Sequence, residues 1–378
     1  MSAASFQLIT HTEDLESLAQ DLNKQSLIAV DTESNSLHAY REQVCLIQFS
    51  TAKNDYLVDP LALDDLSSLA RVFSSPGIET IFHAAEYDLI VLKRDYGFEF
   101  ANLFDTMVAA RILGRKRVGL GNLLEEELGV KLAKRYQRAD WGKRPLSPEM
   151  LDYARLDTHY LVQLRKKFKA ELEQTGRWPI AHEDFARMPH IIPEQSAGPN
   201  GSIWNIKGVR DLKPDQTAIL QQLADYRDQQ AQRADVPLFK IMGDRTLTAI
   251  AANAPRSTGE LAQVEGMSDG QIRRHGEALL KAVQRGVGAE APRRPPRSPY
   301  DEEYVERVEA LRSWRKLTAR EMAVESDVVL PRDVMETIAH ANPHNPAQLD
   351  PLLSDLPWRK AQYSQGILKT LSALKGQR

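Results

Sequence analysis

Two acidic residues at the end of the first strongly apolar run of the chain could hold a divalent metal ion. The run at residues 27–30 leads directly into Asp31-Thr32-Glu33. Successive side chains of a β-strand point to opposite faces, so Asp31 and Glu33 share one face. Two carboxylates at the mouth of a buried strand form half of a divalent-metal site. The same spacing occurs at residues 14–16 and 301–303, so the spacing alone also fits an ordinary acidic turn after a strand.

Three further residues could complete such a site. Asp88 lies in the first turn of a helix expected after the strand at 80–83, where a carboxylate could instead simply complement the helix dipole. Tyr153 and Asp157 are four residues apart in a helix expected from Pro148 to about Glu173. Residues four apart share one helical face, so the phenol and the carboxylate would face the same space. Tyr136 and Asp140 have the same spacing, but they lie in a basic connector where helical geometry is less assured.

These residue types suit one particular chemistry. Clustered carboxylates raise one another's pKa, and two bound divalent cations relieve that repulsion. Oxygen ligands without Cys or His favour Mg²⁺ or Mn²⁺ over zinc. Two such ions clamp the attacking and leaving oxygens of a phosphodiester, while a tyrosine hydroxyl can orient or help deprotonate a bound water. The residues therefore predict phosphodiester hydrolysis without a covalent enzyme intermediate.

The elements expected around these residues form an α/β domain. Short strands are expected at residues 6–10, 27–31, 44–50, 55–58 and 80–83, and helices at 12–22, 64–73, 85–96, from 104, and from 147 to about 173. Early strands followed by alternating helices and strands predict a mixed sheet flanked by helices. Polar groups at the strand ends and on neighbouring helices would then meet at one edge of the sheet.

Three ordered motifs carry a resemblance to a known family. VDTES at 30–34, HAAEYD at 83–88 and YARLD at 153–157 resemble the three exonuclease motifs of the DEDD superfamily of 3′→5′ exonucleases, whose fold is ribonuclease H-like. The tyrosine four residues before the last aspartate resembles the tyrosine branch of that superfamily. FDTMVAARIL at 104–113 and RADWGKRPLS at 138–147 are similar to ribonuclease D.

The resemblance implies roles for individual residues. It makes Asp31, Glu33, Asp88 and Asp157 ligands of two Mg²⁺ or Mn²⁺ ions, and it makes Tyr153 the residue that positions the nucleophilic water. Asp105 would support the site by hydrogen bonding rather than bind metal. Thr32, whose side chain faces away from Asp31 and Glu33 along the strand, is expected to pack behind the site.

The second half of the chain contains a repeat with an offset of 88 residues. IAANAP at 250–255 returns as IAHANP at 338–343, and further apolar pairs keep the same register, including Leu223 with Leu311. Each copy reads as several short amphipathic helices and hence as a small helical bundle. The copies resemble HRDC domains, which implies auxiliary, salt-sensitive binding of nucleic acid. A protein-docking or purely structural role remains an alternative.

The predicted domains follow from these features. They are a 3′→5′ exonuclease domain at 1–176, a linker at 177–210, HRDC-like domains at 211–289 and 300–378, and a proline-rich linker between these at 290–299. No apolar run reaches membrane-span length, and the N-terminus lacks a secretory signal pattern. We therefore expect a cytoplasmic protein that makes no membrane contact. We also expect it to be a monomer. The single cysteine, Cys45, is expected to be a buried core thiol.

A basic stretch precedes the Tyr153 helix. The net charge of the chain is −3, yet ten Lys and Arg against four acids lie between Arg111 and Arg144. Such a run is either a solvated helical face or a contact with the substrate backbone. Trp141 within it is either a core residue or a platform on which a base stacks.

The function expected from sequence is that of a metal-dependent 3′→5′ exoribonuclease. It would trim RNA 3′ ends and release 5′-mononucleotides, with transfer-RNA precursors as the substrate class that the resemblance implies. No residue selects RNA over DNA, because that choice needs a 2′-hydroxyl contact. A DNA exonuclease of the same superfamily is therefore one alternative, and a non-catalytic RNA-binding protein on a nuclease scaffold is another.

Overall fold

The computed structural model describes residues 6–133, 135–192, 202–294 and 301–375. The chain divides into two compact units. One consists of Met1–Glu33, Val44–Pro193 and Pro299–Arg378, and the other of Ser34–Gln43 and Glu194–Ser298. No helix in the described residues is long and apolar enough to span a membrane.

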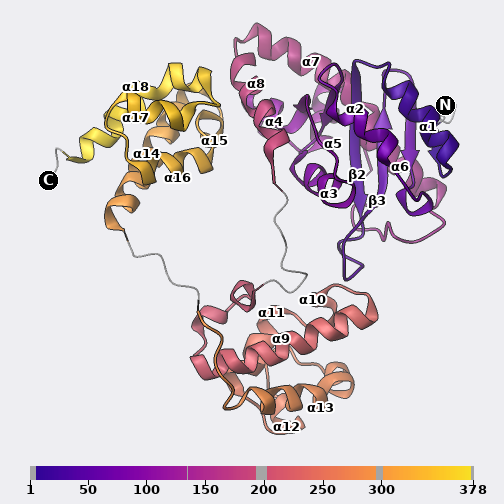
Figure 1. The fold of residues 1–378 in the computed structure, drawn as a ribbon, viewed down its shortest axis with the longest axis vertical. Helices are drawn as coiled ribbons and strands as arrows, with labels where there is room; N and C mark the ends of the chain where they lie inside the picture. The colour runs from indigo at the N-terminus through magenta and orange to yellow at the C-terminus, as the bar shows by residue number, and fades with distance from the viewer. Residues whose placement is uncertain (1–5, 134, 193–201, 295–300, 376–378) are drawn as a thin grey trace. The chain divides into compact units, whose positions relative to one another are not determined.

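A six-stranded mixed sheet forms the centre of the exonuclease-like part of the first unit (Figure 1). Its strands are β1 (Phe6–Ile9), β2 (Leu27–Ser34), β3 (Val44–Ser50), β4 (Asp55–Val58), β5 (Glu79–Phe82) and β6 (Leu103–Asp105). Their order in the sheet is β1-β4-β3-β2-β5-β6. The pairs β1–β4, β2–β5 and β5–β6 are parallel, whereas β3–β4 is antiparallel. The predicted mixed sheet is thus confirmed.

Helices cover both faces of this sheet. They are α1 (Thr12–Leu22), α2 (Ala70–Ser74), α3 (Glu86–Tyr96), α4 (Thr106–Ile112), α5 (Leu120–Leu128), α6 (Pro148–His159), α7 (Leu161–Gln174) and α8 (Trp178–Arg187). Ile28 and Val30 of β2 pack with residues of α1, α2 and α3, whereas Ala29 packs with α4, α5, α7 and α8. Alternation along the strand therefore places Asp31 on the same face as Ala29.

A third cluster lies under α6. Cys45 and Leu57 pack there with Trp141 and Ala154, and all four are buried. The prediction of a buried core thiol at Cys45 is confirmed.

Three local expectations differ from the structure. The long helix expected to about Glu173 is two helices, α6 and α7, which meet at Tyr160. The helix expected at 64–73 is α-helical only from Ala70, after the 3-10 turn at Ser67–Leu69. Strand β6 was missed because it is three residues long and runs directly into α4, so that its apolar residues read as the first turn of that helix.

The repeat is confirmed element by element. The first copy contains α9 (Pro214–Ala234), α10 (Leu238–Ile241), α11 (Asp244–Asn253), α12 (Thr258–Leu261) and α13 (Asp269–Gly286). The second contains α14 (Glu302–Met322), α15 (Ser326–Val329), α16 (Arg332–Ala341), α17 (Pro346–Leu349) and α18 (Pro357–Lys375). Corresponding helices begin 88 residues apart, and each copy has its own buried apolar cluster.

The second copy belongs to the first unit and is tied to α8 by a buried ion pair. Arg359 of α18 is completely buried and donates to Glu183 at 3.0 Å and to Asp184 at 2.9 Å. The corresponding position of the first copy, 88 residues earlier, is Gln271. Its amide oxygen accepts from the backbone N–H of Ser268 in a capping box at the start of α13. The two copies therefore share a core but differ in what this position contacts.

Candidate active site

Three of the predicted carboxylates converge in space. Ligand atoms of Asp31, Glu33 and Asp157 all lie within 4.8 Å of one another. The first two stand on β2, and the third is delivered by α6. Motifs that are distant in the sequence, on β2 and on α6, therefore come together. The alternation of the strand and the period of the helix place their carboxylates on the faces that meet.

The start of α6 is fixed by local chemistry. Ser147 is the N-cap residue, and its hydroxyl accepts from the backbone N–H of Met150 at 3.3 Å. Pro148 occupies the first helical position, where its missing N–H and restricted φ are favourable. Both features were predicted and are confirmed. They set the helical register that places Tyr153 one turn before Asp157.

Tyr153 lies beside the carboxylates. Burial raises the pKa of its phenol, and the charges of Asp157, Glu33 and Asp31 raise it further. A phenol is already protonated at neutral pH and this shift only strengthens that state, so Tyr153 can donate a hydrogen bond. Its ring is flanked by those of Trp141 and Tyr136, with centroids 6.3 Å and 5.8 Å away. These rings restrict the orientation of the phenol.

Asp88 approaches from the opposite face of β2 and is not part of that group of three, although its charge raises the pKa of Asp31 and of Glu33. It is a buried residue in the first turn of α3, and its Oδ1 accepts from the hydroxyl of Thr32 at 2.5 Å. Thr32, expected only to pack behind the site, is buried but also makes this polar contact. The sequence signal that could have revealed it is a hydroxyl on the face of β2 opposite to Asp31. One strand therefore supplies two carboxylates directly and holds a third through Thr32.

The four carboxyl groups have raised pKa values. Loss of water raises the pKa of Asp31 and of Glu33 well above the usual range, and the charges of Asp88 and Asp157 raise both further. Burial raises the pKa of Asp88 and of Asp157 to about 7. Full ionisation of these carboxyl groups without a bound cation therefore destabilises the folded protein. A set of hard oxygen donors with this charge fits a divalent cation.

Asp105 supports the loop before α3. Its carboxylate accepts from the backbone N–H groups of Ala84 (3.2 Å), Ala85 (2.7 Å), Met107 (2.7 Å) and Val108 (3.0 Å). Ala84 has a left-handed backbone with φ of 63°, a conformation that L-residues adopt only where the surroundings hold it. Asp105 thus fixes the turn from which α3 presents Asp88, in agreement with its predicted supporting role.

Much of the basic stretch is neutralised within the protein. Among its cations, Arg111 pairs with Glu325 and Asp327, Arg115 with Glu127 and Glu171, Arg117 with Glu126, Lys131 with Glu125, Lys143 with Asp140, and Arg144 with Asp59. Lys134 lies outside the described residues. Trp141 is 1% exposed, which makes it a core residue rather than a stacking platform. Arg111, Arg115 and Arg144 are therefore held within the fold, whereas Lys131 and Lys143 are 82% and 80% exposed at their side chains.

Comparisons with known proteins agree with this site. A family model described as a 3′-5′ exonuclease matches residues 6–173, and an HRDC domain model matches residues 216–283 and 305–371. Ribonuclease D of Escherichia coli strain K12 is 33% identical over 74% of this chain and 75% of its own length. The chain belongs to the ribonuclease D family. It is thus a ribonuclease D-like 3′→5′ exoribonuclease of the DEDD superfamily.

Two further likenesses extend the family match. The crystal structure of Escherichia coli RNase D, described as an exoribonuclease involved in structured RNA processing, superposes with a TM-score of 0.71 at 27% identity. It covers 98% of this chain and 99% of the other. The exosome complex exonuclease Rrp6 of Saccharomyces cerevisiae is 33% identical over 73% of this chain, which spans 39% of that longer protein. The ribonuclease D family match thus includes both HRDC copies.

Proposed function

We propose that this protein trims the 3′ ends of RNA, including transfer-RNA precursors, and releases 5′-mononucleotides. The observation that carries the proposal is the convergence of Asp31, Glu33 and Asp157 within 4.8 Å, beside Tyr153. Asp88 adds a fourth carboxylate, oriented by Thr32. In this proposal the four acids hold two Mg²⁺ or Mn²⁺ ions.

Each part of the site has a role in hydrolysis. Two divalent ions would activate water at neutral pH and stabilise the charge that develops on the phosphodiester. Tyr153 keeps its proton at neutral pH, as a phenol ordinarily does, so its hydroxyl can orient the attacking water by hydrogen bonding. Trp141 and Tyr136 hold the phenol ring in place. Asp105 holds the turn that carries Asp88.

The domain division of the chain is part of the proposal. The exonuclease domain would span residues 1–176 and the HRDC-like domains residues 211–289 and 300–378, joined by linkers at 177–210 and 290–299. The first of these linkers contains α8, which packs with the sheet, so that helix would belong with the exonuclease domain. We propose that the first HRDC-like domain contributes auxiliary contacts to RNA phosphates. For the second copy the buried Arg359–Glu183 pair favours a structural role on α8. The protein would act in the cytoplasm as a monomer.

One experiment tests the catalytic proposal against its alternatives. A 3′-extended tRNA and a matched single-stranded DNA are incubated with the protein in Mn²⁺, Mg²⁺ or EDTA, and products are resolved by length and as mononucleotides. We expect stepwise loss of 3′ nucleotides from RNA with either metal and none in EDTA. Asp31→Ala should abolish cleavage, whereas Asp14→Ala, which alters an Asp-x-Glu pair of the same spacing on α1, should not.

The other outcomes discriminate among the alternatives. Cleavage that survives both EDTA and Asp31→Ala would refute the metal mechanism. Equal degradation of the DNA would favour a DNA exonuclease. Binding of RNA without any cleavage by the wild type would favour a non-catalytic scaffold.

A further inference from the structure

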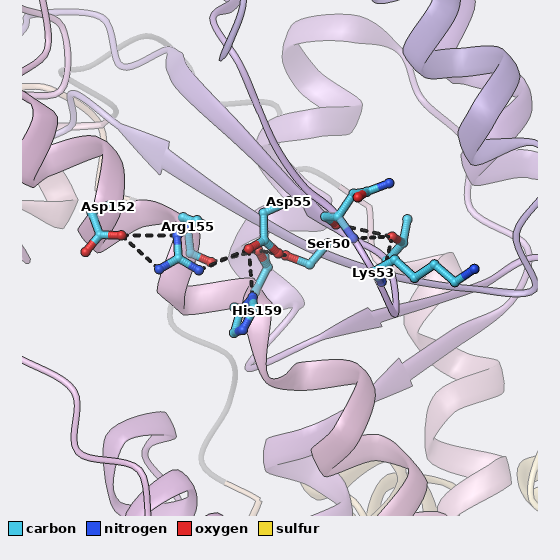
Figure 2. Close-up of polar contacts among 9 residues, drawn as sticks. Ser50, Lys53, Asp55, Asp152, Arg155 and His159 are labelled. Atoms are coloured by element: carbon cyan, nitrogen blue, oxygen red, sulfur yellow. Dashed lines mark hydrogen bonds and ion pairs between the residues drawn. The ribbon is translucent and has the colours of Figure 1, made fainter. Parts of the chain in front are cut away.

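A buried polar cluster anchors α6 on the side away from the carboxylates. At its centre is Asp55, the first residue of β4, which is 6% exposed (Figure 2). Its Oδ1 accepts from the hydroxyl of Ser50 at 2.7 Å. Its Oδ2 accepts from the guanidinium of Arg155 at 3.0 Å and lies 2.7 Å from Nδ1 of His159. One carboxylate thus joins β3, β4 and α6.

The helical residues of this cluster interleave with those of the site. With 3.6 residues per turn, Tyr153 and Asp157 share one face of α6, and Arg155 lies on the opposite face. His159 is four residues after Arg155 and shares that face. Figure 2 shows both side chains directed from the helix toward Asp55. The hydroxyl of Thr158, between Asp157 and His159, lies 2.7 Å from that of Ser50. The same short helix is therefore held on one face and reactive on the other.

The contacts of Asp55 not only attach α6 to the sheet but also restrict rotation of the helix about its axis. Arg155 and Asp55 are both about 6% exposed at their side chains, and Arg155 also donates to Asp152. A buried guanidinium held by two carboxylates has a fixed direction. The second contact, from His159, lies one helical turn further along. Two contacts to one carboxylate, a turn apart, fix both the rotation of α6 about its axis and its position along that axis.

We propose that Asp55 is a positioning residue for the exonuclease reaction. By fixing α6 from behind, it sets where the Tyr153 hydroxyl and the Asp157 carboxylate stand relative to Asp31 and Glu33. The inference rests on the proposed function, because it concerns the same metal-binding and water-orienting residues. Asp55 does not itself contact the reacting atoms. Its effect passes through the rotation of the helix.

The test replaces Asp55 by asparagine, which keeps the size of the side chain and the acceptor for Ser50. The amide cannot serve both Arg155 and His159, so α6 loses one of its two fixed points. Misplacement of catalytic groups by about 1 Å can cost about 100-fold in rate. We expect kcat for RNA trimming to fall by about tenfold to 100-fold, with KM for RNA unchanged. Mn²⁺ should also bind more weakly, because the carboxylate of Asp157 is displaced relative to those of Asp31 and Glu33. We expect a rise of about tenfold in the Mn²⁺ concentration that gives half of the maximal thermal stabilisation.

A matched control separates positioning from mere stability. Glu183→Gln also neutralises a buried carboxylate paired with a buried arginine, Arg359, in the same unit. It should lower thermal stability while leaving kcat and the Mn²⁺ response unchanged at a temperature where the protein is folded. The milder Ser50→Ala variant removes the bridge from Asp55 to Thr158 and should reduce kcat in the same direction as Asp55→Asn, with unchanged KM. It provides the readout if Asp55→Asn does not fold.

Two results would overturn the inference. If Asp55→Asn, or Ser50→Ala in its place, lowers stability yet retains wild-type kcat and Mn²⁺ response, Asp55 is only a structural anchor. If the wild type itself neither trims RNA nor is stabilised by Mn²⁺, the proposed function fails and this inference with it. The wild-type measurement distinguishes the two failures.

Discussion

Replacing Asp88 by asparagine should stabilise the metal-free protein at pH 8. Asp88 is buried, and loss of water raises the pKa of its carboxyl to about 7, although the hydrogen bond from Thr32 opposes the rise. An ordinary aspartate has a pKa of about 4, and each pKa unit corresponds to about 1.4 kcal/mol. The ionised group therefore costs the folded state about 4 kcal/mol at pH 8. Asparagine keeps an acceptor oxygen for Thr32 without the charge. We therefore expect the free energy of unfolding at pH 8 to rise by about 2–4 kcal/mol.

The pH dependence of this gain has a definite sign. The folded-state pKa of Asp88 lies above the unfolded one, so its contribution to stability is complete below pH 4 and is lost as the pH rises through 7. The metal-free wild type should thus become more stable as the pH falls from 8 to 5. The advantage of Asp88→Asn should shrink over the same range to less than about 2 kcal/mol. Saturating Mn²⁺ should reverse the order, because only the wild type offers all four carboxylates.

The assay is urea denaturation followed by circular dichroism, in EDTA, between pH 5 and 8. Asp105→Asn is the matched control, since Asp105 is equally buried but accepts from four backbone N–H groups. The amide N–H of asparagine would face those donors, so the free energy of unfolding of the variant should fall by about 1–3 kcal/mol. The reasoning is refuted if Asp88→Asn is less stable than the wild type at pH 8, or if its advantage does not change with pH.

Three further predictions concern the neighbourhood of the site. Tyr153→Phe should lower kcat by about 100-fold or more while leaving Mn²⁺-dependent thermal stabilisation unchanged, because the phenol orients water rather than binding metal; single-turnover cleavage measures the first and melting curves the second. Trp141→Ala should destabilise the protein by about 3–5 kcal/mol in denaturant unfolding, because the ring is 1% exposed; a change in RNA affinity alone would instead support a stacking role. Arg144 donates to both oxygens of Asp59 and to the carbonyl oxygen of Cys45, so Arg144→Ala should reduce the free energy of unfolding and leave the salt dependence of RNA binding unchanged; a shallower slope of log affinity against log salt would show that this arginine contacts phosphate.

The geometry of the candidate site was largely predictable because it depends on local periods. Alternation along β2 places Asp31 and Glu33 on one face, and the helical period of α6 places Tyr153 above Asp157. Each pair is fixed within five residues of sequence, so no tertiary information is needed to orient it. The topology of a mixed sheet then brings the two pairs together. Asp88 followed from its place at the start of α3.

The contacts that the sequence did not predict are those made by single side chains across the fold. Thr32 reaches Asp88, 56 residues away, and Asp55 reaches Arg155, 100 residues away. The contact of Asp55 has no period, motif or cap that would indicate it, and the only sequence signal for that of Thr32 is its position on the face of β2 opposite to Asp31. The break between α6 and α7 at Tyr160 was equally invisible, because the sequence there contains neither proline nor glycine.

Charge in the sequence was a poor guide to substrate contact for the same reason. An excess of arginine and lysine between residues 111 and 144 indicates a basic surface only while the partners of those residues are unknown. In the fold, Arg115 lies between two glutamates and Arg144 holds Asp59. Since guanidinium groups satisfied by buried carboxylates would have to break those pairs to bind phosphate, their contribution to RNA affinity would be offset by lost stability. The repeat gives another example of a cation used within the fold. Arg359 forms an ion pair with Glu183 of α8, whereas its counterpart Gln271 caps a helix. Arg115 and Arg144 are therefore poor candidates for contacts with RNA phosphates.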